Sequence, residues 1–248
     1  MMTDSEKTAG AEGEQASVTA WFDHTYQTEG FKYLRPLAAY PIFLQLLEAR
    51  AGAEHLDVAC GPGLLLKASA LRGLNPSGVD VSRAALDIAA DFVPEATLRE
   101  GNAEELPFES ESFDYITCVG AIERFFDRRK ALEEMLRVGR DDARFCFMVR
   151  NSSTLSWLLW CRLLGQKNVR GHQDALDMEQ WTALFDEVGL EVLEVHADQW
   201  PRQRLRRLLP GSRKRDLSLD EKVAVPLIPM RYVNEFIFIM RKRGTQAP

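Results

Sequence analysis

The sequence lacks the spacings that mark metal, disulfide and redox centres. It contains four histidines and four cysteines in 248 residues, and no CxxC pair. The cysteines lie in apolar surroundings without a histidine partner, so we interpret them as reduced core residues. They are Cys60, Cys118, Cys146 and Cys161. No metal site is predicted.

Long hydrophobic runs are also missing. The longest, residues 155–164 (LSWLLWCRLL), is too short to span a bilayer and contains Arg162. Residues 1–18 have neither the basic nor the apolar region of a signal peptide, and they carry little that can pack. We therefore expect a flexible tail over residues 1–18 and a cytoplasmic protein.

The composition is that of a globular protein, with 46% hydrophobic and 27% charged residues. Residues 19–52 combine helical patterns with Pro36 and Pro41, which predicts a helical cap ahead of the main domain. We expect one domain over residues 53–248, with an apolar insertion at 150–175 and a basic insertion at 200–230.

Positive charge is concentrated near the C-terminus, although the formal net charge is −6. Residues 202–215 interleave seven basic side chains with leucines. This pattern predicts peripheral contact with an anionic membrane. A solvated face that balances the acidic body fits it equally well, and RNA contact is a third reading.

Short apolar runs alternate with helical patterns along the chain. Strands are expected at 55–60, 77–81, 96–100, 112–120, 143–149, 190–197 and 234–240, and helices at 64–73, 83–92, 127–139 and 178–189. Strands separated by helices of this length predict βαβ units in an α/β fold with a mainly parallel, doubly wound sheet. Ser82 and Asp127 are placed as helix N-caps.

The stretch LDVACGPGLLL, residues 56–66, predicts a strand, a tight glycine turn and a helix. A P-loop is excluded because Leu66 and Ala68 stand where the second glycine and the hydroxyl are needed. A dinucleotide fingerprint is disfavoured because Leu66 also replaces its third glycine. A nucleoside ligand without that phosphate contact remains, with Asp80 placed to accept hydrogen bonds from both ribose hydroxyls.

Three motifs in order carry a family resemblance: LDVACGPG, GVDVS and the segment from Asn102 to Glu104. Together they make the chain resemble the class I S-adenosylmethionine-dependent methyltransferases, in the small-molecule, type 11-like branch. The resemblance implies a Rossmann-like sheet of seven strands with helices on both faces and an antiparallel last strand. It implies S-adenosylmethionine as the cofactor, and methyl transfer to oxygen, nitrogen or carbon of a small acceptor.

The resemblance also implies roles for individual residues. Asp57 and the loop from Ala59 to Gly63 would surround the methionine part, and Asp80 with Val81 would hold the ribose and adenine. Asn102 and Ala103 would contact the adenine amine region, and Cys118 and Val119 would present backbone to the amino-acid part of the cofactor. The loop set is Ala59, Cys60, Gly61 and Gly63. Apart from the resemblance, Tyr33 and Arg35 are placed to reach the cofactor carboxylate.

The acceptor side is less well defined by the sequence. The apolar insertion predicts an apolar acceptor, with Glu123, Trp157, Trp160 and His172 as candidate contacts. Arg124 stands where many members of the family carry histidine, which argues against a histidine-based mechanism. The candidate bases are His24, Tyr26, Glu123, His172 and His196, and none of them is singled out.

Two other classes remain open from the sequence. One is a non-catalytic S-adenosylmethionine-binding regulatory or assembly protein, because no base is evident. The other is an NAD-dependent oxidoreductase, which rests only on the shared glycines and acid. Methylation of nucleic-acid bases is disfavoured because residues 118–123 (CVGAIE) lack the Asn/Asp-Pro-Pro-aromatic turn. The oligomeric state is not predicted.

Overall fold

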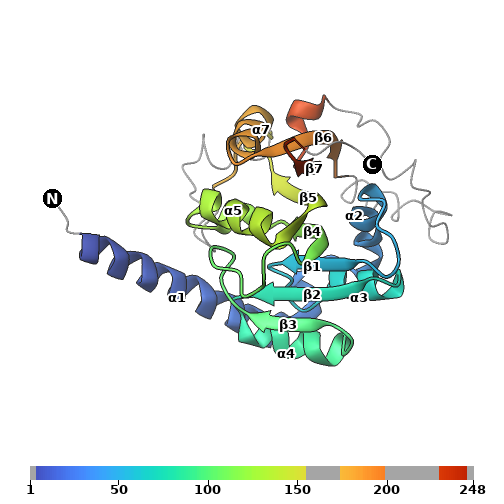
Figure 1. Cartoon of the computed structure of the whole chain (residues 1–248). Coiled ribbons are helices and arrows are strands. Elements are labelled where there is room, and N and C mark those ends of the chain that lie inside the picture. The colour runs from blue at the N-terminus through green and yellow to red at the C-terminus, as the bar shows by residue number, and fades with distance from the viewer. Residues whose placement is uncertain (1–3, 155–173, 199–228, 245–248) are drawn as a thin grey trace, which may run out of the picture.

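The computed structural model describes residues 4–154, 174–198 and 229–244, and its centre is a seven-stranded sheet (Figure 1). The strand order is β3-β2-β1-β4-β5-β7-β6, and only β7 runs antiparallel to its neighbours. The strands are β1 (Glu54–Val58), β2 (Asn75–Asp80), β3 (Thr97–Glu100), β4 (Phe113–Val119), β5 (Gly139–Arg150), β6 (Leu190–Ala197) and β7 (Glu235–Lys242). The predicted Rossmann-like architecture is confirmed.

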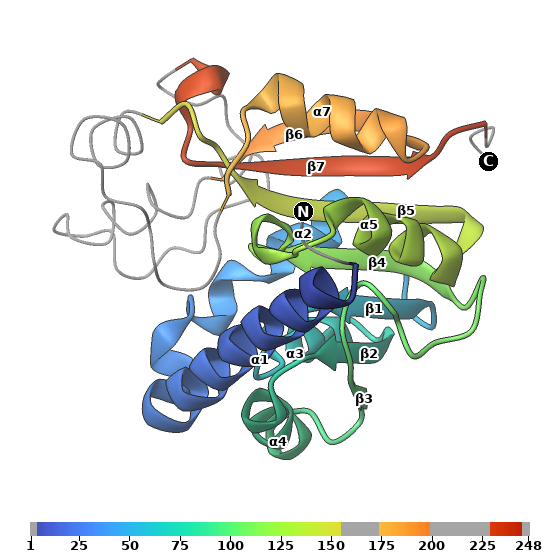
Figure 2. The ribbon, with the colours of Figure 1, turned by 90° about the vertical axis from the view of Figure 1, so that its left-hand side faces the viewer.

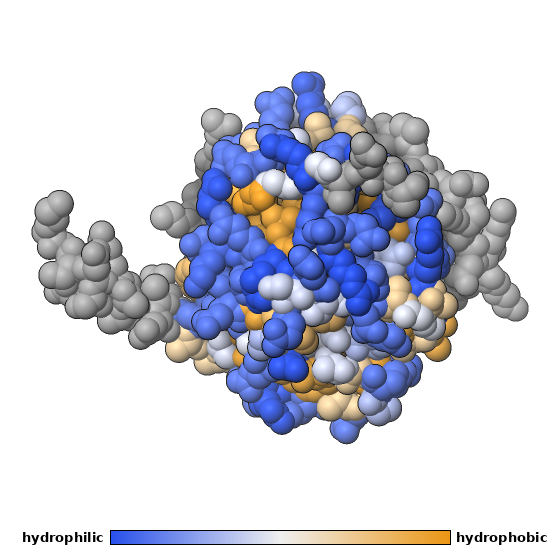
Figure 3. All heavy atoms as spheres, in the orientation of Figure 1, coloured by the Kyte–Doolittle hydropathy of each residue, from blue (hydrophilic) through white to orange (hydrophobic). Residues whose placement is uncertain are grey.

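Helices cover both faces of the sheet. The described helices are α1 (Asp4–Glu29), α2 (Pro41–Leu46), α3 (Leu64–Leu71), α4 (Arg83–Phe92), α5 (Arg128–Val138) and α7 (Met178–Glu187), with short 3-10 turns η1 (Gly30–Tyr33), η2 (Leu37–Ala39), η3 (Ile122–Arg124) and η5 (Met230–Tyr232). Helices α5 and α7 pack on one face and α2 and α3 on the other, which Figure 1 shows as opposite sides of the strands. Apolar side chains are therefore enclosed, and the face seen in Figure 3 is mostly hydrophilic.

Local sequence explains where several helices begin. The Ser82 hydroxyl accepts from the Ala85 N–H at 3.2 Å, and the Asp127 carboxylate accepts from the Lys130 N–H at 3.0 Å. These side chains satisfy amide groups that have no partner inside the helix. Helix α7 has a full capping box between Asp177 and Gln180. Both predicted N-caps are confirmed.

The N-terminal segment differs from the expected tail. Helix α1 begins at Asp4 and continues to Glu29, so residue 18 does not mark the start of regular structure. Figure 1 shows that the C-terminal part of α1 lies next to α4, at the side where β2 and β3 end, and that its N-terminal part projects away from the sheet. Figure 2 shows this side of the molecule from the front. The Asp23 carboxylate accepts from the Ser82 hydroxyl at 2.6 Å and the Ala84 N–H at 3.1 Å. These two contacts fix α1 against the start of α4, which the sequence pattern did not indicate.

Strand β5 is longer than predicted. It begins at Gly139 instead of residue 143, and its first residues include the exposed Asp141 and Asp142. The pairing with β4 is irregular here, because the register shifts between Phe113 and Tyr115. The apolar pattern marks only the buried part of β5, which explains the missed start.

Candidate active site

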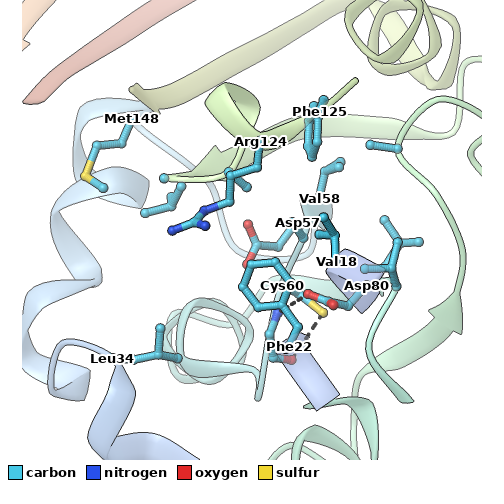
Figure 4. Close-up of a pocket in the computed structure, with 18 of the residues that line it drawn as sticks. Val18, Phe22, Leu34, Asp57, Val58, Cys60, Asp80, Arg124, Phe125 and Met148 are labelled. Carbon is cyan, nitrogen blue, oxygen red and sulfur yellow. Dashed lines mark hydrogen bonds between the residues drawn. The ribbon is translucent and has the colours of Figure 1, made fainter. Parts of the chain in front are cut away.

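A cavity of about 320 Å³ lies at the carboxyl ends of the central parallel strands (Figure 4). The strands β1, β2, β4 and β5 contribute their last residues or the residues that follow them. Helix α1 contributes Val18, Phe22 and Tyr26, and the segment after it contributes Tyr33 and Arg35. The cavity thus lies where doubly wound sheets bind ligands.

The glycine turn after β1 forms one wall of this cavity. Ala59 and Gly61 have φ values of 58° and 53°, in the left-handed region. A Cβ on Gly61 would lie 3.0 Å from the Tyr26 hydroxyl oxygen, so α1 and the turn approach closely. Glycine at position 61 therefore serves both the backbone conformation and the space above the turn.

Asp80 holds this turn in place from the end of β2. Its carboxylate accepts from the Gly61 N–H at 2.8 Å and from the Ser82 N–H at 2.9 Å. A carboxylate has about four lone-pair sites, so accepting capacity remains on the side that lines the cavity. Burial raises the pKa of Asp80 to about 6, while the hydrogen bonds from Ser82 and Gly61 act in the opposite direction.

Asp57, at the end of β1, is the second buried carboxylate in the cavity. It accepts from the Thr117 hydroxyl at 2.6 Å. Burial raises the pKa of Asp57 to about 7, the Thr117 hydrogen bond lowers it, and the charge of Asp80 raises it further. Two buried carboxylates in one cavity favour a ligand that brings positive charge or hydroxyl donors.

A series of hydrogen bonds between buried polar side chains leads to Asp57 and fixes its orientation. His55 lies between Ser69 and Thr117, with Nδ1 2.9 Å from the Ser69 hydroxyl and Nε2 2.9 Å from the Thr117 hydroxyl. Burial lowers the pKa of His55 to about 3, so the ring is neutral. Because Thr117 uses its hydrogen on Asp57, the His55 Nε2–H donates to Thr117 and the Ser69 hydroxyl donates to Nδ1. The sequence analysis missed His55 and Thr117, although polar residues inside two apolar strands were the available signal.

The raised pKa values predict a pH-dependent affinity. We expect the Kd for S-adenosylhomocysteine to fall by at least about 10-fold between pH 5 and pH 8. Its ammonium and ribose hydroxyls bind best to ionised carboxylates, and burial raises the pKa of Asp80 to about 6 and that of Asp57 to about 7. Titration calorimetry across this range measures it. In Asp80→Asn the Kd should change less with pH. An equally steep change of Kd with pH in that variant would show that ionisation of Asp80 does not cause it.

The same shifts affect the stability of the ligand-free protein. The folded state holds these two protons more tightly than the unfolded chain, in which an aspartate has its ordinary pKa of 3.8. Stability therefore decreases as pH rises from about 4 to about 7. At neutral pH, ionisation of the two buried aspartates therefore lowers the free energy of unfolding of the ligand-free protein. Binding of a ligand to the folded state raises it again.

The loop after β3 lines the opposite end of the cavity. Asn102 and Ala103 of this loop line the cavity, and so does Val81, which directly follows β2. The resemblance implied all three contacts. The Asn102 side-chain oxygen accepts from the Glu104 N–H at 3.1 Å, so it also holds the loop in its turn. Phe125, which follows η3, adds an aromatic wall that the sequence analysis did not identify.

Near the glycine turn, the cavity is lined by Cys60, Val119, Tyr33 and Arg35 from the predicted set. The Arg35 guanidinium forms ion pairs with Asp198, at 3.0 Å, and with Glu235. Its charge is offset by these two carboxylates, which come from the far end of the sequence. Arg35 therefore joins the N-terminal segment to the ends of β6 and β7, and its predicted contact with a cofactor carboxylate stays a prediction.

Some predicted residues lie away from the cavity wall. Cys118 is fully buried in the core, because alternation along β4 turns Val119 and not Cys118 toward the ligand side. Gly63 is the N-cap of α3 with φ 84°, and a Cβ there would face Ala89 and Val93. The role predicted for Cys118 is to present backbone to the amino-acid part of the cofactor, so it stays a prediction, and so does the contact predicted for Gly63. Trp157, Trp160 and His172 fall outside the described residues.

Glu123 occupies a different position from the one expected of a base. Its side chain is fully buried and does not line the cavity. Its Oε1 lies 3.4 Å from Nε of Arg150, which does line the cavity. Burial raises the pKa of Glu123. Glu123 thus contacts Arg150 and not the ligand space, which corrects its assignment as a substrate contact.

The other candidate bases are also poorly placed. His24 is exposed on α1, and His196 lies 2.7 Å from Glu194 on β6; neither lines the cavity. Tyr26 does line it, but burial raises its pKa well above the usual value, which keeps the hydroxyl protonated. Within residues 4–154, 174–198 and 229–244, no histidine lines this cavity.

The cavity fits a nucleoside ligand with a positively charged end. Asp57 and Asp80 offer buried acceptors, the backbone of residues 59–61 allows close approach, and Val81 with Phe125 offers apolar contact for a base. In the described part of the chain, no group of three His, Cys, Asp or Glu side chains is arranged to hold a metal ion. Nor does any helix in these ranges have the length and apolarity needed to cross a bilayer.

Comparison with known proteins agrees with this chemistry. Residues 56–147 match the family model described as a methyltransferase domain. The chain is 35% identical over 109 residues to the uncharacterised methyltransferase YcgJ of Bacillus subtilis, which covers 42% of this chain and 43% of that protein. It is 30% identical over 148 residues to a ubiquinone biosynthesis O-methyltransferase of Alkalilimnicola ehrlichii, covering 58% of this chain and 60% of that protein.

Solved structures show the same fold at lower identity. A chain from the complex between the Haloferax volcanii Trm112 methyltransferase activator and a methyltransferase has a TM-score of 0.69 at 18% identity, over 93% of this chain and 100% of that one. This likeness shows the fold, a Rossmann-like sheet that the chain shares with solved methyltransferase structures. Residues 56–147 are therefore a methyltransferase domain of the type 11 branch. The chain is similar to class I S-adenosylmethionine-dependent methyltransferases, a class whose cofactor is S-adenosylmethionine. It spans only about half the length of the two curated relatives, 43% and 60%.

Proposed function

We propose that this protein transfers a methyl group from S-adenosylmethionine to oxygen, nitrogen or carbon of a small-molecule acceptor bound in the cavity. One observation carries the proposal: two buried carboxylates and the glycine turn share a single cavity with residues that follow β4 and β5. The first group suits the cofactor, and the second, which includes Arg124 and Arg150, leaves a separate wall for an acceptor.

The cofactor contacts follow from the geometry of the strand ends. Asp80 accepts hydrogen bonds from the ribose hydroxyls, with its orientation fixed by the Gly61 and Ser82 amides. Asp57, oriented by Thr117, accepts from the ammonium group. Val81, Phe125 and the loop at Asn102 surround the adenine.

The bound cofactor supplies an electrophilic methyl group on a sulfonium, and the protein mainly has to align the acceptor with it. Correct alignment of two reactants contributes roughly 7–11 kcal/mol toward a barrier. Helix α1 lines the cavity with Phe22 and Tyr26, whose rings give it an apolar wall. The absence of a well-placed histidine among the described residues fits a reaction that relies on alignment.

Oxygen is the acceptor atom that the relatives favour. The Alkalilimnicola ehrlichii relative is named an O-methyltransferase that acts in ubiquinone biosynthesis. A phenol or enol oxygen becomes a good nucleophile once its proton is lost, which general-base catalysis or a nearby cation promotes. Nitrogen and carbon acceptors stay within the proposal.

The acceptor is also proposed to have an apolar part. Phe22 and Met148 line the same cavity and give the acceptor side an apolar surface. The predicted contributions of the apolar insertion (155–164) and of the basic segment at 202–215 concern residues beyond the described ranges. It therefore stays a prediction that residues 155–164 line the acceptor site, and that residues 202–215 contact a membrane.

A transfer assay tests the proposal. The purified chain is incubated with S-adenosylmethionine labelled in its methyl group and with pooled small phenols, amines and a small-molecule cell extract. We expect label to enter a small molecule with one S-adenosylhomocysteine formed per methyl transferred, and Asp80→Ala to lose most of this. S-adenosylhomocysteine binding without any transfer would favour the non-catalytic alternative and overturn the proposal.

A further inference from the structure

We propose that Arg124 binds an anionic oxygen group of the acceptor, so that the substrate class is small molecules that combine an apolar body with a carboxylate or similar oxyanion. This inference rests on the proposed function, because it assigns the acceptor part of the same cavity. It adds a substrate-recognition residue that the resemblance did not supply.

The position of Arg124 is defined by packing. It ends η3, the short turn after β4, and its guanidinium lies 5.3 Å from the centre of the Phe22 ring on α1. Figure 4 shows the side chain extending into the cavity, toward the space between Met148 and Asp57. Stacking on an aromatic face fixes the plane of a guanidinium while leaving its edge free to bind an oxyanion.

Among the described residues no carboxylate forms an ion pair with Arg124, although the nearby Glu123 favours the protonated guanidinium. Its Nη1 is buried and has no hydrogen-bond partner within the described residues. Burial lowers the pKa of Arg124 from its ordinary value, Tyr33 and Glu123 act in the opposite direction, and the neighbouring Arg150 lowers it. An arginine remains protonated at neutral pH despite such a shift, so a buried donor without a partner favours an anion.

The other two arginines of the cavity differ from Arg124 in this respect. Arg35 is paired with Asp198 and Glu235, and Arg150 lies 3.4 Å from the buried Glu123 carboxylate. No carboxylate of residues 4–154, 174–198 or 229–244 forms an ion pair with Arg124. Arg124 is therefore the cavity arginine that is best suited to bind an incoming anion.

The acceptor fits this position better than the cofactor does. The cofactor contacts proposed above lie at the ends of β1 and β2 and in the turn at 59–61. Arg124 instead follows β4, close to the Arg150 end of β5, and the effect of Arg150 on its pKa reflects that proximity. Two neighbouring cations on the β4 and β5 side would attract an anion before methyl transfer.

Benzoate tests this, with benzamide as its uncharged counterpart. We expect benzoate, titrated at millimolar concentrations into the complex with S-adenosylhomocysteine, to bind at least 10 times more tightly than benzamide, because the guanidinium makes a charged hydrogen bond. Arg124→Met should remove this preference, and Arg124→Lys should retain part of it. Arg129→Met is the matched control. Arg129 lies on α5, is half-exposed and forms an ion pair with Glu187 of α7, away from the cavity.

The possible results distinguish a failure of the assignment of Arg124 from a failure of the proposed function. An unchanged affinity of Arg124→Met for S-adenosylhomocysteine, together with lost benzoate binding, supports an acceptor site. Competition between benzoate and S-adenosylhomocysteine, or a 10-fold weaker S-adenosylhomocysteine affinity in Arg124→Met, would assign the arginine to the cofactor carboxylate and overturn the inference. Equal or absent binding of benzoate and benzamide would also overturn it. Failure of the wild type to bind S-adenosylhomocysteine would instead contradict the proposed function.

Discussion

Asp80→Ala is expected to weaken S-adenosylhomocysteine binding by roughly 10- to 150-fold, the effect of losing hydrogen bonds to a charged group. In the structure Asp80 is buried at the end of β2 and accepts from the Gly61 and Ser82 amides. Alanine removes the acceptor for the ribose hydroxyls and also releases the glycine turn. Both losses act on the cofactor end of the cavity, and titration calorimetry measures their sum.

Two further variants separate these effects. Asp80→Asn keeps the shape and one acceptor oxygen but removes the charge, so its affinity should lie between those of the wild type and Asp80→Ala. Asp91→Ala changes an exposed carboxylate on α4 and should bind like the wild type. Wild-type affinity in a folded Asp80→Ala protein would show that this carboxylate does not hold the cofactor.

Gly78→Val is expected to lower the free energy of unfolding by about 3 kcal/mol, as overpacking of a tight core does. Gly78 lies in β2, and a Cβ there would be 2.7 Å from Leu66 Cδ1 and 2.8 Å from Cys60 Sγ. Leu66 stands where a dinucleotide fingerprint has its third glycine. The space that a glycine on the helix would provide is here provided by a glycine on the neighbouring strand.

Chemical denaturation followed by circular dichroism measures this change. Gly13→Ala is the matched control, because nothing lies within 4 Å of a Cβ at that position of α1. It should leave the stability unchanged or raise it by up to about 1 kcal/mol, since alanine favours helix more than glycine does. Wild-type stability in Gly78→Val would mean that α3 and β2 are not packed as closely as the structure has them.

The sheet and its helix boundaries were predictable because they depend on short-range patterns. Alternating apolar runs identified the strands, and Ser82 and Asp127 marked helix starts through hydrogen bonds to residues three positions later. The extension of β5 to Gly139 was missed because its first residues are exposed and polar. Helical structure was predicted from residue 19, but the part of α1 before it was not, because residues 4–18 carry few apolar side chains. The position of α1 was not predicted either, since Asp23 bonds to residues about 60 positions away.

The cofactor end of the site was more predictable than the acceptor end. Asp57, Asp80 and residues 59–61 of the glycine turn belong to contiguous motifs, and all of them line the cavity. The orientation of Cys118 and Glu123 depends on strand register and on packing against Arg150, which no local pattern records. Arg35 shows the same limit, because its partner Glu235 is 200 residues away in the sequence.

The most direct test of the account is a calorimetric titration of the wild-type protein with S-adenosylhomocysteine and, separately, with NADH. The account predicts one S-adenosylhomocysteine bound per chain and no measurable binding of NADH, because Leu66 removes the glycine that pyrophosphate binding uses. Binding of NADH without S-adenosylhomocysteine would contradict it, and would assign the glycine turn and Asp80 to a dinucleotide.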